Sequence, residues 1–208
     1  MIIIEHIETY GMEAAFRGMR NPLNSWDRSD SCVDEDGNFA AGVKDLKLAE
    51  NLCRSGSDHR KFMRQIMISM DITAPLYWWK EFDTYKVGTV ANSCSTMHTL
   101  HKRPIVLEDF STDGMGKFAV GELESLIQTL NIFREKYLEK GEEGLWRSMI
   151  QLLPCSYNQK RTVTANYEVI RNMVGARAGH KLTEWREFCR KMEELPYYAQ
   201  LIGTDGKG

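Results

Sequence analysis

The sequence lacks the spacings of cysteine and histidine that mark disulfide frameworks and metal sites. Its five cysteines are scattered over 208 residues without a CxxC pair. An odd, scattered set argues against a disulfide framework and against a structural zinc site. The five histidines include no HExxH spacing, so metal chemistry has no support in the sequence. A reducing, cytoplasmic setting is the simplest interpretation.

A strong net charge and a long apolar run are also missing. The formal net charge is -2 and the pI is near 6.2, which gives no reason to expect a nucleic-acid polymer as partner. Local basic clusters still permit small anionic ligands. No apolar run approaches a membrane span, and the start, MIIIEHIE, turns to charged residues too early for a secretory signal. A single globular domain over residues 1–208 is expected.

Residue patterns predict both helices and strands. The first residues indicate a strand, and residues 65–73 alternate as a strand with one buried face does. Residues 21–41 read as a mobile polar loop and about 203–208 as a flexible tail. Helices are expected over residues 12–20, 43–56, from Pro75 onward, 119–139, 145–154, 166–177 and 183–195. This pattern indicates an α+β domain.

One stripe of the helix over residues 166–177 mixes polar and apolar side chains. Asn166, Ile170, Met173 and Arg177 follow each other at steps of four, three and four. A buried arginine needs a partner, and a phosphate or carboxylate can bind it at two points. Alternatively, Asn166 caps the helix and Arg177 only sits near its negative end. Spacing alone leaves both interpretations open.

The segment PLYWWKEFDTYKVGTVANSCSTMH joins an aromatic helix face to a polar stretch. Its aromatic residues can stack on a flat ring or form core, and its lysines can hold phosphate or remain solvated. Ser93, Cys94 and Ser95 suggest a nucleophile, but no positioned histidine and acid accompany them. Covalent catalysis therefore has little support.

Ordered features over most of the chain resemble the flavin-dependent thymidylate synthases. In that family a His-rich segment precedes a strand, Ala-Pro opens a helix, and Arg-His-Arg-x-x-Ser and a Ser- and Arg-containing loop follow. Leu-Pro, an Asn-x-Arg helix ending in Leu-Arg and a Gln-Trp-Glu helix complete the order. The matching positions are His59, Ala74-Pro75, Leu153-Pro154, Asn166, Asn172, Arg177 and Glu184-Trp185.

Several family arginines are replaced in this chain. Thr84, Tyr85 and Lys86 stand where the family has Arg-His-Arg, while Thr89 keeps the hydroxyl. Thr96 and Glu168 fill two further arginine positions. Ile150 stands at the arginine position before Leu-Pro, and Arg147 lies one turn earlier. Because a charge-assisted hydrogen bond contributes about 1.5–3 kcal/mol, two such losses weaken phosphate binding by about two orders of magnitude.

The resemblance implies a small, mostly antiparallel sheet packed with several long helices. It also implies FAD bound between the subunits of a homotetramer, NADPH as reductant, and transfer of a one-carbon unit from methylenetetrahydrofolate to dUMP. No enzyme nucleophile attacks the pyrimidine in this chemistry, and no catalytic residue is assigned. The implied cofactor-binding positions are His59, Thr84, Tyr85, Lys86, Thr89, Asn166 and Asn172, and the implied substrate-binding positions are Ser93, Cys94, Ser95 and Arg177.

Three functions stay open at this point. The chain can be a flavin-dependent methylating enzyme, which the polar positions Asn166, Asn172, Arg177, His59 and Thr89 favour. It can be a diverged homologue that keeps the fold and the oligomer as a nucleotide-binding, flavin-binding or structural protein, which the replaced arginines favour. An unrelated helical domain would bind neither flavin nor nucleotide.

Overall fold

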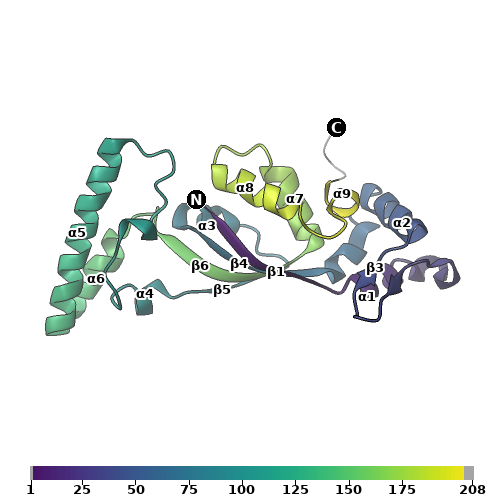
Figure 1. Cartoon of the computed structure of the whole chain (residues 1–208), viewed down its shortest axis with the longest axis horizontal. Coiled ribbons are helices and arrows are strands. Elements are labelled where there is room, and N and C mark those ends of the chain that lie inside the picture. The colour runs from purple at the N-terminus through teal and green to yellow at the C-terminus, as the bar shows by residue number, and fades with distance from the viewer. Residues whose placement is uncertain (1, 204–208) are drawn as a thin grey trace. The chain divides into compact units, whose positions relative to one another are not determined.

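The structure is a computed structural model that describes residues 2–203, in which helices outnumber strands (Figure 1). The strands are β1 Ile3–Tyr10, β2 Cys32–Val33, β3 Phe39–Ala40, β4 Met67–Pro75, β5 Thr89–Ser93 and β6 Asn158–Asn166. The α-helices are α1 Met12–Gly18, α2 Val43–Arg54, α3 Leu76–Phe82, α4 Thr96–Thr99, α5 Lys117–Lys140, α6 Glu143–Leu152, α7 Tyr167–Arg177, α8 Thr183–Met192 and α9 Tyr198–Leu201. The 3₁₀ turns are η1 Asn21–Leu23, η2 Trp26–Arg28, η3 Arg60–Gln65 and η4 Leu107–Asp109.

A small antiparallel sheet has the strand order β1-β4-β6-β5, and β2 and β3 form a separate two-stranded sheet. The α+β class expected from the sequence is therefore confirmed. The described chain divides into two compact units. Unit 1 consists mainly of Ile72–Thr84 and Asn92–Thr162, and unit 2 consists of Ile4–Asp71, Tyr85–Ala91 and the residues from Val163 onward. The single-domain organisation stays a prediction.

The core of unit 1 lies between α5, α6 and the segment that precedes α5. In Figure 1, α5 and α6 lie side by side, and the two helices pack on each other. Asn131 on α5 holds the preceding segment by two hydrogen bonds. Its side-chain amide accepts one from Ile105 N at 2.9 Å and donates one to Ile105 O at 2.8 Å. The buried residues of this core are Leu100, Ile105, Phe110, Leu123, Ile127, Leu130 and Met149.

The aromatic face of α3 is core and does not form an open stacking platform. Trp78, Trp79 and Phe82 are at most 1% exposed. Trp79 Nε1 donates to the Gln159 carbonyl at 2.9 Å, and the Arg161 guanidinium lies 4.2 Å from the centre of a Trp79 ring. The alternative that these rings stack on a flavin or a base is therefore wrong for these three side chains, because their surfaces are covered by protein.

Unit 2 packs its helices around η3 and α7. The packed pairs are α7 with η3, α1 with η3, α2 with α9, α7 with α8, and α2 with η3. Ile170 and Met173 of α7 are fully buried, as the helical stripe predicts. The apolar middle of the stripe therefore faces the core. Its two polar residues, Asn166 and Arg177, lie at the two ends of the helix.

The segment 21–41 contains short regular elements where the sequence predicts a mobile loop. It includes η1, η2 and the β2–β3 pair, in which Cys32 is paired with Ala40 and Val33 with Phe39. Asp30 accepts hydrogen bonds from Lys44 N and Asp45 N, so this segment is fastened to the first turn of α2. Of the predicted tail at about 203–208, residues 204–208 lie outside the described residues.

The predicted helices agree with the structure, whereas two strands differ from the expectation. α5 ends at Lys140, and Gly141 takes a φ of 68°, which glycine adopts readily at a helix end. Residues 89–93, expected as a polar loop, form β5, and residues 158–166, left without an element, form β6. Within residues 2–203, no helix is long and apolar enough to cross a membrane.

Candidate functional site

In unit 2, Arg177 at the end of α7 is held by two aromatic side chains. Its Nε donates to the Tyr85 hydroxyl at 2.9 Å. Its guanidinium lies 4.9 Å from the centre of a Trp185 ring and 5.7 Å from the Tyr85 ring centre. Trp185 itself is fully buried, so it forms a fixed platform for the cation. Arg177 is therefore oriented by specific contacts, and its place at the helix end is only part of its role.

At the other end of α7, Asn166 caps the helix. Its Oδ1 accepts from Val169 N at 3.0 Å, as the capping interpretation of the stripe predicts. Gly88 lies against this cap with a φ of +79°, and a Cβ built there would be 2.8 Å from Asn166 Nδ2 and 3.0 Å from Val169 Cγ2. Thr89 Oγ1 donates to the Tyr85 carbonyl and closes the turn between them.

These contacts bring four predicted site residues together along α7: Tyr85, Thr89, Asn166 and Arg177. The segment 85–89 touches both ends of the helix, because Gly88 meets its cap and Tyr85 meets its last residue. Lys86 and Asn172 are exposed in the same unit. The set therefore offers two cations and several amide and hydroxyl groups at an open surface, which is a donor set suited to phosphate.

A carboxylate at the start of α7 neutralises part of the positive charge of unit 2. Glu168 accepts from Arg60 Nε at 3.3 Å and from Arg64 Nε. Burial alone would raise the pKa of Glu168, but the hydrogen bonds and charges of Arg64 and Arg60 outweigh it and hold the pKa below its ordinary value. Glu168 is therefore ionised at neutral pH and pairs with two cations, of which Arg60 is mostly covered and Arg64 is half exposed.

The remaining predicted residues do not join this set. His59 is an exposed residue of unit 2 that precedes η3 and lines a separate cavity. Thr84 belongs to unit 1, where its hydroxyl donates to Glu81 O at 2.7 Å. Ser93, Cys94 and Ser95 also belong to unit 1.

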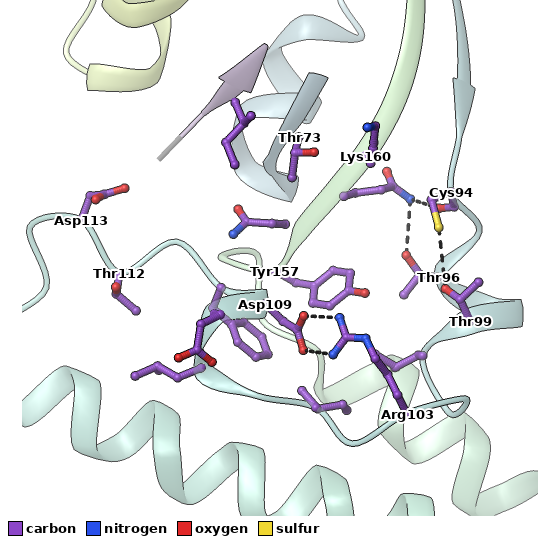
Figure 2. A pocket seen from close by; sticks show the side chains of 18 residues that line it. Thr73, Cys94, Thr96, Thr99, Arg103, Asp109, Thr112, Asp113, Tyr157 and Lys160 are labelled. Carbon is purple, nitrogen blue, oxygen red and sulfur yellow. Dashed lines mark hydrogen bonds and ion pairs between the residues drawn. The ribbon is translucent and has the colours of Figure 1, made fainter. Parts of the chain in front are cut away.

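Unit 1 contains a cavity of about 700 Å³, shown in Figure 2, and Cys94 lies on its wall. Cys94 N donates to Lys160 O at 2.9 Å, and Gln159 Nε2 donates to Cys94 O at 3.0 Å and to Thr96 Oγ1 at 3.3 Å. These bonds attach the residues that follow β5 to β6. The polar stretch of the sequence thereby becomes one wall of a pocket.

On another wall, Arg103 is paired with Asp109. Arg103 Nη1 donates to Asp109 Oδ2 at 2.9 Å and Nη2 donates to Oδ1, so the pair is held at two points. The hydrogen bond to Asp109 raises the pKa of Arg103. Burial raises the pKa of Tyr157, whose ring lies between this pair and the Cys94 wall in Figure 2, and the Asp109 carboxylate raises it further.

The lining of this cavity favours an uncharged ligand. Its charged residues are two cations and three carboxylates: Arg103, Lys160, Glu108, Asp109 and Asp113. The rest of the lining combines apolar side chains with hydroxyl and amide groups, the usual composition of a site for a small heterocycle. Within residues 2–203, no cluster of three or more His, Cys, Asp or Glu side chains could hold a metal ion.

Two solved structures resemble the chain over nearly its whole length. Thymidylate synthase X from Helicobacter pylori, solved with FAD and dUMP, has a TM-score of 0.74 and 16% identity, and the match covers 97% of both chains. A second structure of that flavin-dependent enzyme, complexed with FAD and dUMP, has a TM-score of 0.68 and 17% identity, again with 97% of both chains covered. The chain has the thymidylate synthase X fold. No family model and no curated protein matches the sequence.

Tyr85, Thr89, Asn166 and Arg177 stay predicted site residues, and the sequence did not indicate the residues that support them. Arg60 and Arg64 belong to η3, where no motif marks them as partners of Glu168. Arg103, Asp109 and Tyr157 lie outside the matched motifs. The one available signal was the alternation of Val163 and Ala165 with polar residues, which indicates a strand but not the segment with which it pairs.

Proposed function

We propose that the chain binds FAD and a pyrimidine nucleotide and transfers a one-carbon unit from methylenetetrahydrofolate to dUMP, with NADPH as reductant. The observation that carries this proposal is the fold likeness over 97% of both chains to structures that contain FAD and dUMP. A binding surface of this kind works by positioning the reactants, because the cofactor itself supplies the redox chemistry when it is bound.

The residues along α7 fit an anionic cofactor. Lys86 supplies positive charge, and Tyr85 and Asn166 supply hydroxyl and amide groups, while Arg177 at the end of α7 is the proposed contact to the anionic nucleotide. Gly88 leaves space where any side chain would strike the helix cap, so the backbone of the turn can approach α7 closely. In unit 1, Ser93, Cys94 and Ser95 are the proposed contacts to the nucleotide, and the adjacent cavity has the size and polarity to admit its uncharged base.

A homo-oligomer, most simply a tetramer, is part of the proposal. Lys86 and Asn172 are exposed on the single chain, so a second subunit is needed to enclose a ligand on this surface. Light scattering coupled to gel filtration measures the assembly state. A strictly monomeric protein would count against a flavin site shared between subunits.

A second candidate is a diverged protein that keeps the fold and oligomer and binds a nucleotide or flavin without methylating dUMP. The ion pairs of Glu168 favour it, because Glu168 stands at a family arginine position and pairs with Arg60 and Arg64, which makes these two cations less available to an anionic ligand. Thr84 stands at another arginine position. It carries no charge, and its hydroxyl donates a hydrogen bond to the Glu81 carbonyl at the end of α3.

A visible absorption spectrum of the purified protein, repeated after incubation with FAD and gel filtration, tests the proposal first. Retained flavin absorbance supports the cofactor site, and a dUMP methylation assay with NADPH and the folate then separates the two candidates. A protein that binds FAD but forms no thymidylate is the diverged protein. A protein that retains no FAD after gel filtration, and that also binds none in equilibrium dialysis against excess FAD, contradicts both flavin-binding interpretations.

Arg177 gives a sharper test of nucleotide binding. We expect Arg177→Ala to abolish measurable dUMP affinity and to leave the melting temperature nearly unchanged. Arg190→Ala is the matched control, because Arg190 is an exposed arginine on the neighbouring helix α8. If Arg177→Ala lowers stability and leaves dUMP affinity intact, then Arg177 has a structural role only.

A further inference from the structure

A cysteine and a lysine outside the candidate site lie against each other in unit 1. Lys80 Nζ donates to Cys155 Sγ at 3.2 Å. Lys80 is on α3, and Cys155 is in the turn that precedes β6. Both residues are exposed, so a small reagent in solution can reach the sulfur. The fold therefore places a thiol and an amine, two nucleophilic groups, in direct contact.

The backbone on both sides of this contact is held by hydrogen bonds. Tyr77 N donates to the Cys155 carbonyl at 3.1 Å. Leu76 N donates to the Tyr157 carbonyl at 3.0 Å, so the turn is attached to the first turn of α3. Lys80 follows Leu76 by four residues, which is about one helical turn. The two side chains thus start from elements that the fold already holds together.

The packing of α3 leaves Lys80 on the exposed side of the helix. Trp78, Trp79 and Phe82 are at most 1% exposed and form the covered side. Within residues 2–203, no carboxylate forms an ion pair with Lys80, and its polar contact is the one to Cys155. The amine is therefore not held by an acid, and the sulfur is its partner.

We infer that Cys155 and Lys80 form a modification site at which hydrogen peroxide joins the two side chains through a sulfur–nitrogen bond. Peroxide oxidises an accessible cysteine to a sulfenic acid, and a sulfenic acid condenses with an adjacent nitrogen to give a sulfenamide. Here the adjacent nitrogen is the Lys80 amine, in contact with the sulfur before oxidation begins.

The reaction balances with one molecule of peroxide. The Cys155 sulfur takes one oxygen atom from the peroxide to form the sulfenic acid, and the other oxygen leaves as water. The Lys80 ammonium loses a proton to solvent, and its nitrogen attacks the sulfur. The S–O bond breaks, and the hydroxyl leaves as water with a second proton from the nitrogen. The sulfur is oxidised by two electrons, and the peroxide is reduced to two molecules of water.

The cross-link keeps the oxidation of Cys155 reversible. Two molecules of a thiol reductant return the S–N bond to the free thiol and the free amine, and they are themselves oxidised to a disulfide. A sulfenic acid that is not captured in this way proceeds with further peroxide to sulfinic acid, which thiols do not reduce. The pair therefore protects an exposed cysteine from irreversible oxidation.

Peptide mapping by mass spectrometry, after peroxide treatment of the full chain, tests the inference. We expect the Cys155 and Lys80 peptides to be linked with a loss of two hydrogens, and a thiol reductant should separate them. Cys32 and Cys94, also exposed, should gain oxygen instead. The variant Lys80→Arg keeps the positive charge and removes the amine, so its Cys155 should proceed to sulfinic acid. Lys136→Arg is the matched control, at an exposed lysine of α5 in the same unit.

The outcomes decide the inference without reference to flavin or nucleotide. A link in the unaltered chain and in Lys136→Arg, and none in Lys80→Arg, supports it. Oxygen gain at Cys155 of the unaltered chain without a link overturns it, and so does a link from Cys155 to a different lysine. Equal recovery of the Cys155 thiol by reductant in the unaltered chain and in Lys80→Arg shows that the amine gives no protection, and it also overturns the inference. Because no readout involves FAD or dUMP, failure here leaves the proposed function untouched.

Discussion

The buried ion pair between Arg20 and Asp45 gives the largest stability change that we expect from a single substitution. The Asp45 side chain is 1% exposed and that of Arg20 is 6% exposed. Asp45 also accepts from Ser29 Oγ at 2.6 Å, Ser31 Oγ at 2.6 Å and Ser31 N at 3.1 Å. The substitution Asp45→Ala removes the acceptor of four groups and leaves a buried guanidinium without its counter-charge.

Removing one partner of a buried pair costs about 3–5 kcal/mol, because the remaining charge is unpaired in a poorly solvated place. For a chain of about this size, 1 kcal/mol shifts the melting temperature by roughly 2–4 °C, so we expect Asp45→Ala to lower it by about 6–20 °C. Thermal and urea unfolding followed by circular dichroism measure this change.

A matched control lies on the same helix. Glu50→Gln breaks the Arg54–Glu50 pair, in which the two side chains are 60% and 32% exposed. An exposed pair of this kind contributes about 0–1 kcal/mol, so the control should shift the melting temperature by only a few degrees. If Asp45→Ala destabilises the protein no more than Glu50→Gln does, then the buried pair does not hold this part of the fold.

Acid titration tests the same pair without a mutation. Burial alone would raise the pKa of Asp45, but hydrogen bonds from Ser29 and Ser31 and the Arg20 contact hold it below its ordinary value of 3.8. A carboxyl with a depressed folded-state pKa contributes stability that is present above its unfolded pKa and is lost as the pH falls through the folded pKa. Unfolding free energy should therefore fall below about pH 4 in the unaltered chain, and Asp45→Ala should show a smaller fall.

Three further predictions concern other parts of the molecule. Gly88→Ala should destabilise the fold by about 1–3 kcal/mol in urea unfolding, because it combines a φ of +79° with a Cβ placed 2.8 Å from Asn166 Nδ2, whereas Gly144→Ala, with open space around it, should not. Glu168→Gln should reduce unfolding free energy by about 1.5–3 kcal/mol at pH 7 and by progressively less as the pH falls below the ordinary value of 4.5, because a carboxyl with a depressed folded-state pKa loses its contribution as the pH falls through that pKa. A thiol reagent should modify three cysteines in the native protein and all five in denaturant; the native count should comprise Cys32, Cys94 and Cys155, since Cys53 and Cys189 are buried.

Local sequence patterns identified the helices because each of them carries its own signal. The apolar steps of α5 and the glycine that follows it depend only on residues within one segment. β5 has no such signal, because it is an edge strand with mostly exposed polar side chains. Its strand conformation comes from pairing with β6, which lies about 70 residues away in the sequence. Long-range pairing of this kind cannot be read from one polar stretch.

The candidate site likewise has some residues with a local sequence signal and others that only long-range contacts bring into place. The stripe on α7 and the altered motif before β5 predict Tyr85, Thr89, Asn166 and Arg177 as site residues, and in the structure these four lie along α7, with Asn166 and Arg177 at its two ends. The sequence did not indicate that Tyr85 would hold Arg177, since 92 residues separate them. It also did not indicate either cavity, because each is assembled from segments that are unrelated in pattern.

The clamp on Arg177 affects how the flavin and nucleotide assays should be designed. Two aromatic rings restrain the guanidinium, so it loses little side-chain freedom when it binds an anion, and this partly offsets the arginines that the chain lacks. The offset is incomplete, because Glu168 places an anion where the flavin-dependent thymidylate synthases that the sequence resembles have an arginine. A site that is weakened about a hundredfold releases its ligand during gel filtration and still fills at saturating concentration. Equilibrium dialysis at high FAD therefore distinguishes a weakened site from an absent one. Dialysis of Tyr85→Phe against dUMP measures how much of the nucleotide affinity depends on the hydrogen bond between Tyr85 and Arg177.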